Sequence, residues 1–159
     1  MMTSGSTVVT IPTDTQIMIT REFKAAKHLV YKAWTTPELI KRWWSGDRGD
    51  VTLAEVDLRV GGKWRYVMIA DGGFEVAFHG VYREIVPNER IVWTEVFEAM
   101  PDGEALNTVT FTEANGRTTL TLLIHVANKE DRDAMISSGM EHGVREQMEH
   151  LEKIAIELA

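Results

Sequence analysis

Residues 137–158 read SSGMEHGVREQMEHLEKIAIEL, and this C-terminal stretch decides the fold. Its apolar side chains recur every three or four residues, the spacing that places them along one side of an α-helix. The stripe consists of Met140, Val144, Met148, Leu151, Ala155 and Leu158. An apolar stripe on a helix needs a partner to cover it, so we expect the upstream chain to supply a sheet.

The start of this helix has two interpretations. Ser138-Gly139-Met140-Glu141 fits a capping box, in which Ser138 caps the helix and residues 128–136 form a separate helical segment. Without that cap, one helix runs from about residue 129 to residue 158. Gly139 and Gly143 cost a helix about 1 kcal/mol each relative to Ala. They leave room beneath the helix or allow it to approach the sheet closely.

The N-terminal part of the chain predicts one strand and two short helices. Polar and apolar residues alternate over Gln16–Phe23, which indicates a strand with one buried face. Residues 25–34 change to helical spacing. Thr35-Thr36-Pro37-Glu38 then predicts a second helix with a hydroxyl cap and an early proline, ending near Trp44. We expect residues 1–13 to form a flexible tail and residues 14–159 to form one domain.

Five turn signals divide residues 51–126 into six strands: Gly61-Gly62, Asp71-Gly72-Gly73, Pro87-Asn88, Pro101-Asp102-Gly103 and Asn115-Gly116. A two-residue loop at Asn115-Gly116 pairs Phe111 with Leu120 and keeps the apolar side chains on one face. The whole pattern predicts an α+β protein. Seven antiparallel strands form its sheet, two short helices lie between strands 1 and 2, and the C-terminal helix covers the apolar face.

The other hairpins follow from the same parity argument. Val56 and Trp64 share a face only if the loop at Gly61-Gly62 has three residues or the strand bulges. A three-residue loop at 71–73 aligns Tyr66 with Phe78. A two-residue turn at Pro87-Asn88 pairs Tyr82 with Trp93. The last register also places Glu95 on the apolar face, opposite Gly80.

Composition narrows the function classes. The chain has 159 residues, of which 44% are hydrophobic, and it has no cysteine and a formal net charge of -7. The absence of cysteine rules out disulfides and thiolate chemistry and suits a reducing, cytoplasmic setting. The acidic balance disfavours nucleic acid, and no stretch predicts a signal peptide or a membrane-inserted helix.

Several segments resemble one protein family in their order and spacing. They are REF at 21–23, VYKAWTTPEL at 30–39, WW at 43–44, EVDLRVGGKWR at 55–65, GVYREIVPNERIVWT at 80–94 and SGMEHGV at 138–144. Together they resemble the activator of heat-shock-protein-90 ATPase homologues of the START-like (SRPBCC) superfamily. The resemblance implies a helix-grip fold, in which a curved antiparallel sheet wraps around a long C-terminal helix. The superfamily includes lipid carriers, ligand receptors, polyketide cyclases and co-chaperone domains, so fold alone leaves function open.

The apolar face of the predicted sheet carries many aromatic residues. We predict that they line a ligand cavity beneath the C-terminal helix, because small-molecule sites have mostly apolar walls with a few polar groups. The alternative is that they fill the core. The candidate ligand-binding residues are Trp64, Tyr66, Phe78, Tyr82, Trp93, Glu95, Phe97 and Phe111 from the sheet and Met140, Val144 and Met148 from the helix.

Glu95 is the candidate with the most distinctive chemistry. A carboxylate on an apolar face has a raised pKa unless it is paired, which would make it a general acid or base, or an anchor for a donor on the ligand. Alternatively an arginine or Tyr82 satisfies it, or a bulge turns it outward. Glu95 is therefore a weak catalytic candidate, and whether the protein is an enzyme stays open.

His142, Glu146 and His150 share one helix face at intervals of four residues. A metal site needs this kind of spacing, but the three residues lie among Glu141, Arg145 and Glu149, which is typical of a solvated face. His125 is expected to point to solvent by strand parity. We therefore predict neither a metal nor an organic cofactor.

Three functions fit these observations. We favour the binding of a small hydrophobic or aromatic molecule between sheet and helix. The alternatives are an enzyme of the cyclase or hydrolase type that uses Glu95, and a co-chaperone-like or regulatory protein-binding module. The sequence leaves the ligand and the oligomeric state open, with a homodimer and a chaperone partner among the alternatives.

Overall fold

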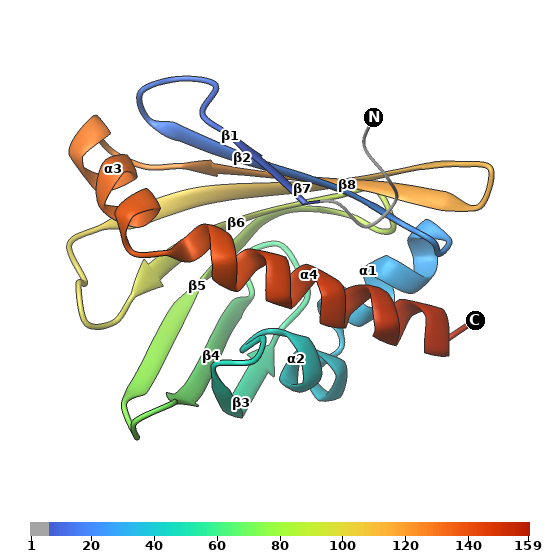
Figure 1. Ribbon diagram of the computed structural model, residues 1–159, viewed down its shortest axis with the longest axis horizontal. Coiled ribbons are helices and arrows are strands. Elements are labelled where there is room, and N and C mark those ends of the chain that lie inside the picture. The colour runs from blue at the N-terminus through green and yellow to red at the C-terminus, as the bar shows by residue number, and fades with distance from the viewer. Residues whose placement is uncertain (1–6) are drawn as a thin grey trace.

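The computed structural model describes residues 7–159, which form one antiparallel sheet and four helices (Figure 1). The strands follow the order β1-β2-β8-β7-β6-β5-β4-β3 across the sheet. The elements are β1 Val8–Thr10, β2 Gln16–Phe23, α1 Lys27–Thr35, α2 Pro37–Trp43, β3 Gly49–Val56, β4 Lys63–Ala70, β5 Glu75–Val86, β6 Arg90–Phe97, β7 Glu104–Ala114, β8 Arg117–His125, α3 Lys129–Ser137 and α4 Met140–Glu157. This is the predicted α+β helix-grip fold.

The sheet has one strand more than the seven predicted. Residues 1–6 of the expected flexible tail lie outside the described residues, but Val8–Thr10 form β1 and pair with β2, Val9 opposite Ile19. Val8-Val9-Thr10 consists of β-branched residues, which suit a strand, so part of the tail prediction is wrong. The six strands predicted for residues 51–126 are all present.

The β7–β8 hairpin confirms the parity argument. Ala114 pairs with Arg117 and Phe111 with Leu120, and Asn115 and Gly116 both have positive φ, as the two-residue turn requires. On the other side of β8, all eight residues of β2 pair in register, so Ile17, Ile19 and Phe23 join the same buried face. Two neighbouring strand pairs therefore present one continuous apolar surface to the helices.

The connection between β3 and β4 is longer than the predicted three-residue loop. β3 ends at Val56 and β4 begins at Lys63, while Leu58 and Val60 lie exposed outside the sheet. Val56 still pairs with Trp64, so the predicted face is correct although the loop length is wrong. The backbone at 61–62 instead bonds to Tyr82 of β5, and this second set of partners is why the hairpin can end early.

The β5–β6 hairpin departs from the prediction in turn length and in register, and the two departures compensate for each other. The turn has three residues, because Val86 pairs with Arg90, whereas a two-residue turn was predicted. A register shift between Tyr82 and Glu84 then restores the predicted pairing of Tyr82 with Trp93 and of Phe78 with Phe97. The bulge at Arg83 thus keeps both aromatic pairs on the inner face. The β4–β5 hairpin has the predicted register, with Tyr66 opposite Phe78.

The two short helices stand where the sequence places them, except for the cap of α2. Thr36 occupies the N-cap position, but its side chain accepts no bond from the helix. Its hydroxyl instead donates to the carbonyl of Lys32 at 2.6 Å, back in α1. Because Thr36 is also the C-cap of α1, the two helices meet at this single residue.

The C-terminal segment forms two helices, and Ser138 does not cap the second one. Asn128 caps α3 by accepting a bond from the backbone N–H of Asp131 at 2.8 Å. The chain then turns at Gly139, whose φ of 84° is a left-handed conformation that glycine adopts without strain. The hydroxyl of Ser138 donates backwards to the carbonyl of Met135. The capping box is therefore not formed.

Helix α4 lies across the concave side of the sheet, with α1 near its C-terminal end and α2 beneath it (Figure 1). Its second half is buried at Leu151, Ile154 and Ala155, and so is Met148 at its midpoint. Arg21 of β2, itself only 2% exposed, reaches up to this half and donates to the carbonyl of Met148 at 2.9 Å and to Glu152 at 3.3 Å. Within residues 7–159, no helix is long and apolar enough to cross a membrane.

Candidate functional site

A cavity of about 980 Å³ lies between the inner face of the sheet and the first half of α4. The sheet provides its floor and the helix its roof. Exposed residues of the lining come from the β6–β7 connection, such as Met100 and Asp102, and from α3, such as Asp131. The cavity therefore opens to solvent between this connection and α3.

Ten of the eleven candidate ligand-binding residues line this cavity. They are Trp64, Tyr66, Phe78, Tyr82, Trp93, Glu95, Phe97, Met140, Val144 and Met148. The structure brings them together because β4, β5 and β6 are neighbours in the sheet and their alternating side chains share the face beneath α4.

Phe111 is the exception. Its side chain is fully buried, and its ring packs edge to face against Tyr31 at 5.7 Å and Trp34 at 6.2 Å between ring centroids. It shares the inner face of the sheet with the other candidates, as parity predicted, but the part of that face around it is covered by α1. Phe111 therefore belongs to the packed core and not to the cavity wall.

The aromatic side chains of the floor contact one another. Trp64 and Tyr66 lie 4.8 Å apart between ring centroids, and Phe78 stacks on Phe97 at 5.0 Å. Trp44, just after α2, packs edge to face on both Tyr66 and Phe78 at 5.4 Å. Offset and edge-to-face pairs of this kind are favourable and fix the orientation of the rings. The apolar wall of the cavity is thus held in one shape by its own contacts.

Gly80 explains how Trp64 reaches its place. The indole Nε1 donates to the carbonyl of Thr94 across β5 at 3.0 Å. A Cβ at residue 80 would come within 1.8 Å of that carbonyl oxygen and within 2.7 Å of the indole nitrogen. Only glycine allows this close approach, so it positions a tryptophan of the wall and satisfies its buried donor.

Glu95 lies in the cavity wall, on the inner face as predicted. Burial in these apolar surroundings raises the pKa of its carboxyl group to about 7, and a hydrogen bond from Asn107 opposes part of that rise. Asn107 pairs across the sheet with Trp93, two residues before Glu95 on the same face. Such diagonal neighbours lie within reach of each other's side chains. At neutral pH the carboxyl group is therefore poised between its two protonation states.

Asn107 is itself an unusual residue for this position. It is 2% exposed, and its Oδ1 has no hydrogen-bond partner among the described residues. The Asn107 amide group donates to Glu95, whose ionised form can only accept, and the carbonyl oxygen is left over. An unpaired buried acceptor costs about 1–3 kcal/mol, so this oxygen is a place where a donor would bind favourably.

Two tyrosine hydroxyls complete the polar part of the wall. Tyr66 donates a hydrogen bond to Tyr82, and burial raises the pKa of both hydroxyls. The nearby Glu95 charge raises the pKa of Tyr66 further. Both tyrosines therefore keep their protons over the physiological range and act as neutral hydrogen-bonding groups.

The roof of the cavity is built from the first half of α4. Met140 and Val144 are partly buried, whereas Met148 is 1% exposed. At Gly143 a Cβ would meet only the side chain of Arg48, at 3.7 Å, which is an ordinary contact. Close packing against the sheet therefore does not require this glycine.

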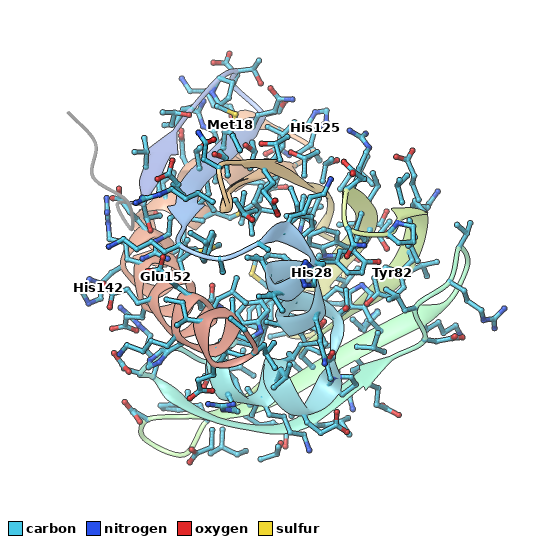
Figure 2. All side chains as sticks on the ribbon, turned by 90° about the vertical axis from the view of Figure 1, so that its right-hand side faces the viewer. Met18, His28, Tyr82, His125, His142 and Glu152 are labelled. Atoms are coloured by element: carbon cyan, nitrogen blue, oxygen red, sulfur yellow. The ribbon has the colours of Figure 1, made fainter. Side chains whose placement is uncertain are left out.

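The helix face that carries His142, Glu146 and His150 does not face the cavity. Figure 2 shows His142 on the outer side of α4 and His125 at the edge of the molecule, and both are exposed. Glu146 and His150 are partly exposed and also contact the turn before β3, which the prediction of a solvated face did not include. Glu146 accepts bonds from Arg48 and from the backbone of Asp47, and His150 pairs with Asp47 at 2.7 Å. Among residues 7–159, no cluster of three His, Asp or Glu side chains could hold a metal ion.

Several residues of the site were not predicted from the sequence. The cavity is also lined by Trp34 of α1, Trp43 of α2, Trp44 directly after α2, and Met135 of α3. Their places depend on how helices pack on the sheet, which strand parity does not describe. Asn107 could have been identified from the sequence, because it shares the face of Val109 and Phe111 and is the one amide in that apolar row.

Comparisons with known proteins agree with this architecture. A family model described as Activator of Hsp90 ATPase homolog 1-like protein matches residues 24–155. A crystal structure of a protein from Rhodobacter sphaeroides is similar over 97% of this chain and 100% of its own, with 25% identity and a TM-score of 0.89. A solution structure from Arthrobacter aurescens is similar over 94% of this chain and 91% of its own, with 25% identity and a TM-score of 0.85. A protein from Nitrosomonas europaea shows the same fold at 23% identity, with 92% of this chain and 97% of its own covered and a TM-score of 0.84. No curated protein sequence matches this chain.

Proposed function

This chain belongs to the family of Activator of Hsp90 ATPase homolog 1-like proteins, and from that premise we propose that it binds a small hydrophobic or aromatic molecule in the cavity under α4. The family resemblance seen in the sequence is thereby confirmed. The proposed site is the space between the inner face of the sheet and the first half of the helix.

The observation that carries the proposal is the cavity itself. Its volume of about 980 Å³ is at the upper end of the range for small-molecule sites, about 300–1,000 Å³. Its walls are mainly aromatic and aliphatic, with a few polar groups from Glu95, Asn107 and the two tyrosines. Apolar walls supply the affinity for an apolar ligand, and the few polar groups fix its orientation.

A cavity-filling substitution tests the proposal. Titration with a neutral apolar probe such as 1-decanol is expected to raise the melting temperature of the native protein in a saturable way, because a ligand that binds only the folded state stabilises it. Val144→Trp fills the space beneath the roof and is expected to weaken this response at least about tenfold. Leu106→Trp is the matched control, since Leu106 is exposed on β7 and lies outside the cavity lining.

The outcome that contradicts the proposal is a melting temperature that does not respond to 1-decanol in the native protein. A response that survives unchanged in Val144→Trp would also contradict it, because the probe would then bind elsewhere. An equal loss in both tryptophan variants would point to a general effect of the added ring, and the proposed site would be wrong.

A second candidate function is an enzyme of the cyclase or hydrolase type that uses Glu95. It is favoured by a carboxyl group whose pKa of about 7 suits a general acid or base, beside the neutral hydroxyls of Tyr66 and Tyr82. Hydrolysis of 4-nitrophenyl esters measures this directly. If Glu95 is the catalytic group, Glu95→Gln abolishes the enzyme-dependent rate and leaves the 1-decanol response intact. Equal rates for the native protein and Glu95→Gln would show that Glu95 is not a catalytic group.

A further inference from the structure

The charged side chains of the cavity wall are all negative. Its lining includes four carboxylates and, among the described residues that form it, no lysine, arginine or histidine. Glu95 lies in the interior, and Asp102, Glu104 and Asp131 come from the exposed segments around the opening. A ligand that enters this space meets negative charge along its path and no cation to pair with an anionic group. Electrostatic complementarity therefore favours a positively charged ligand and rejects a negatively charged one.

At the inner end of this path lies a side-chain oxygen that has no hydrogen-bond partner among the described residues. Asn107 is 2% exposed and lines the cavity, and its Oδ1 has no partner in the described part of the chain. Its amide group meets Glu95, so a carbonyl oxygen and a carboxylate stand beside each other. When Glu95 is ionised, the carboxylate and the carbonyl oxygen only accept hydrogen bonds, and neither can satisfy the other's remaining lone pairs. A donor with more than one hydrogen would satisfy both groups at once, and an ammonium group supplies three such hydrogens if primary and two if secondary.

The surrounding aromatic rings suit a cation as well. Trp64, Tyr66, Tyr82 and Trp93 line the same cavity as Glu95. Aromatic faces attract cations, by about 0.5–1 kcal/mol at exposed sites and about 2 kcal/mol or more when the cation is desolvated. A neutral alcohol would use the same acceptors with fewer donors and would gain little from the rings or from the acidic opening.

We propose that the occupant of the cavity is a cationic amphiphile, an apolar body that carries a primary or secondary ammonium group, with the ammonium seated between Glu95 and Asn107. This inference rests on the proposed function, and it names the class of ligand. The apolar body lies against the aromatic floor and the Met140 and Val144 roof. Fatty acids and other anionic lipids are excluded by the same wall, since their carboxylate would be buried beside Glu95 without a counter-charge.

Three probes with the same ten-carbon chain separate this inference from the proposed function. They are decylamine, 1-decanol and decanoate, titrated at pH 7.5 below the micelle concentrations of the two ionic probes and below the solubility limit of 1-decanol, and followed by calorimetry. The expected order of affinity is decylamine, then 1-decanol at least about tenfold weaker, then decanoate weakest of all. The neutral probe reports whether the cavity takes an apolar chain, and the difference between the charged probes reports the charge preference.

Two variants with the same change in charge locate the preference. Glu95→Gln keeps the shape of the side chain and is expected to weaken decylamine at least about tenfold while 1-decanol changes less than about twofold. Glu149→Gln removes a carboxylate from the exposed side of α4, outside the cavity lining, and is expected to change decylamine less than about twofold at physiological salt, because exposed charges are screened. If Glu95→Gln does not fold, the order of affinity of the three probes for the native protein still tests whether the cavity prefers a cation.

Equal affinities for the three probes, or tightest binding of decanoate, would overturn the inference and leave the proposed function standing. An amine preference that persists in Glu95→Gln would overturn the seat assigned to the ammonium group. Failure of all three probes to bind would remove the proposed function and this inference with it.

Discussion

The two halves of α4 carry one continuous apolar stripe but meet different surroundings. In the second half Leu151 and Ala155 are fully buried, and Arg21 joins β2 to the helix backbone. In the first half Met140 and Val144 are only partly buried, because a cavity lies beneath them. Helical periodicity therefore identifies which face of a helix is covered. Whether that cover is packed core or empty space depends on the layer opposite.

The largest expected difference between the halves is in stability. Leu151→Ala removes a fully buried side chain from a packed region and is expected to lower the free energy of unfolding by about 2–5 kcal/mol. Met140→Ala enlarges a space that already exists and is expected to cost less than about 1 kcal/mol. Urea denaturation of both variants measures this. Equal losses would show that the first half is packed as tightly as the second.

A second test concerns the titration of Glu95 beneath the first half. The folded state raises the pKa of this group from 4.5 to about 7, so the protonated form is the one that folding favours. The resulting stability is fully present below about pH 4.5 and is lost as the pH rises through about 7, by at most about 3 kcal/mol. Solvent screening reduces that figure, because the Glu95 side chain is only partly buried.

Glu95→Gln is expected to remove this pH dependence and to be more stable than the native protein at pH 8. Thermal unfolding of both proteins between pH 4.5 and pH 8 compares them. Parallel curves for the two proteins over this range would mean that Glu95 titrates with an ordinary pKa and is well solvated.

Some of the residues in these predictions were positioned correctly from the sequence, and others were not. Turn chemistry and strand parity are local properties, so they predicted the β7–β8 register and the faces of Tyr66, Tyr82 and Glu95. The pairing of Tyr82 with Trp93 was right although the turn length was wrong, because the bulge at Arg83 compensates. Strand parity does not predict which part of the sheet each helix covers. It therefore could not assign Phe111 to the part of the sheet that α1 covers, or bring Trp44 into the wall.

A smaller effect is expected where the first half of α4 is tied to the turn before β3. Glu146 accepts bonds from the side chain of Arg48 and the backbone of Asp47, both at 3.3 Å. Glu146→Ala is expected to cost about 1–2 kcal/mol in unfolding free energy, because the bonds are charge-assisted and Glu146 is mostly buried. Glu149→Ala, on the exposed side of the same helix, is the matched control and is expected to cost less than about 0.5 kcal/mol. Equal effects would show that these bonds contribute nothing.

Gly143 lies in the first half of α4 and Gly139 directly before it, and effects of opposite sign are expected at these two glycines. Gly143→Ala is expected to stabilise the protein by about 0.5–1 kcal/mol, because alanine suits a helix better and its Cβ makes only an ordinary contact. Gly139→Ala is expected to destabilise it by about 1–2 kcal/mol through its positive φ alone, since nothing lies within 4 Å of the added Cβ. Melting temperatures that move in the same direction for both variants would contradict this distinction.

The borders of the sheet bear on self-association. One border is β1, with only three residues, and the other is β3, whose pairing with β4 is interrupted by a bulge between Val51 and Leu53. A long, flat, unpaired border is a template on which another copy can add a strand and start a fibril. A short border and a twisted one both resist that addition. The protein can therefore keep a wide sheet and an apolar cavity without polymerising through its borders.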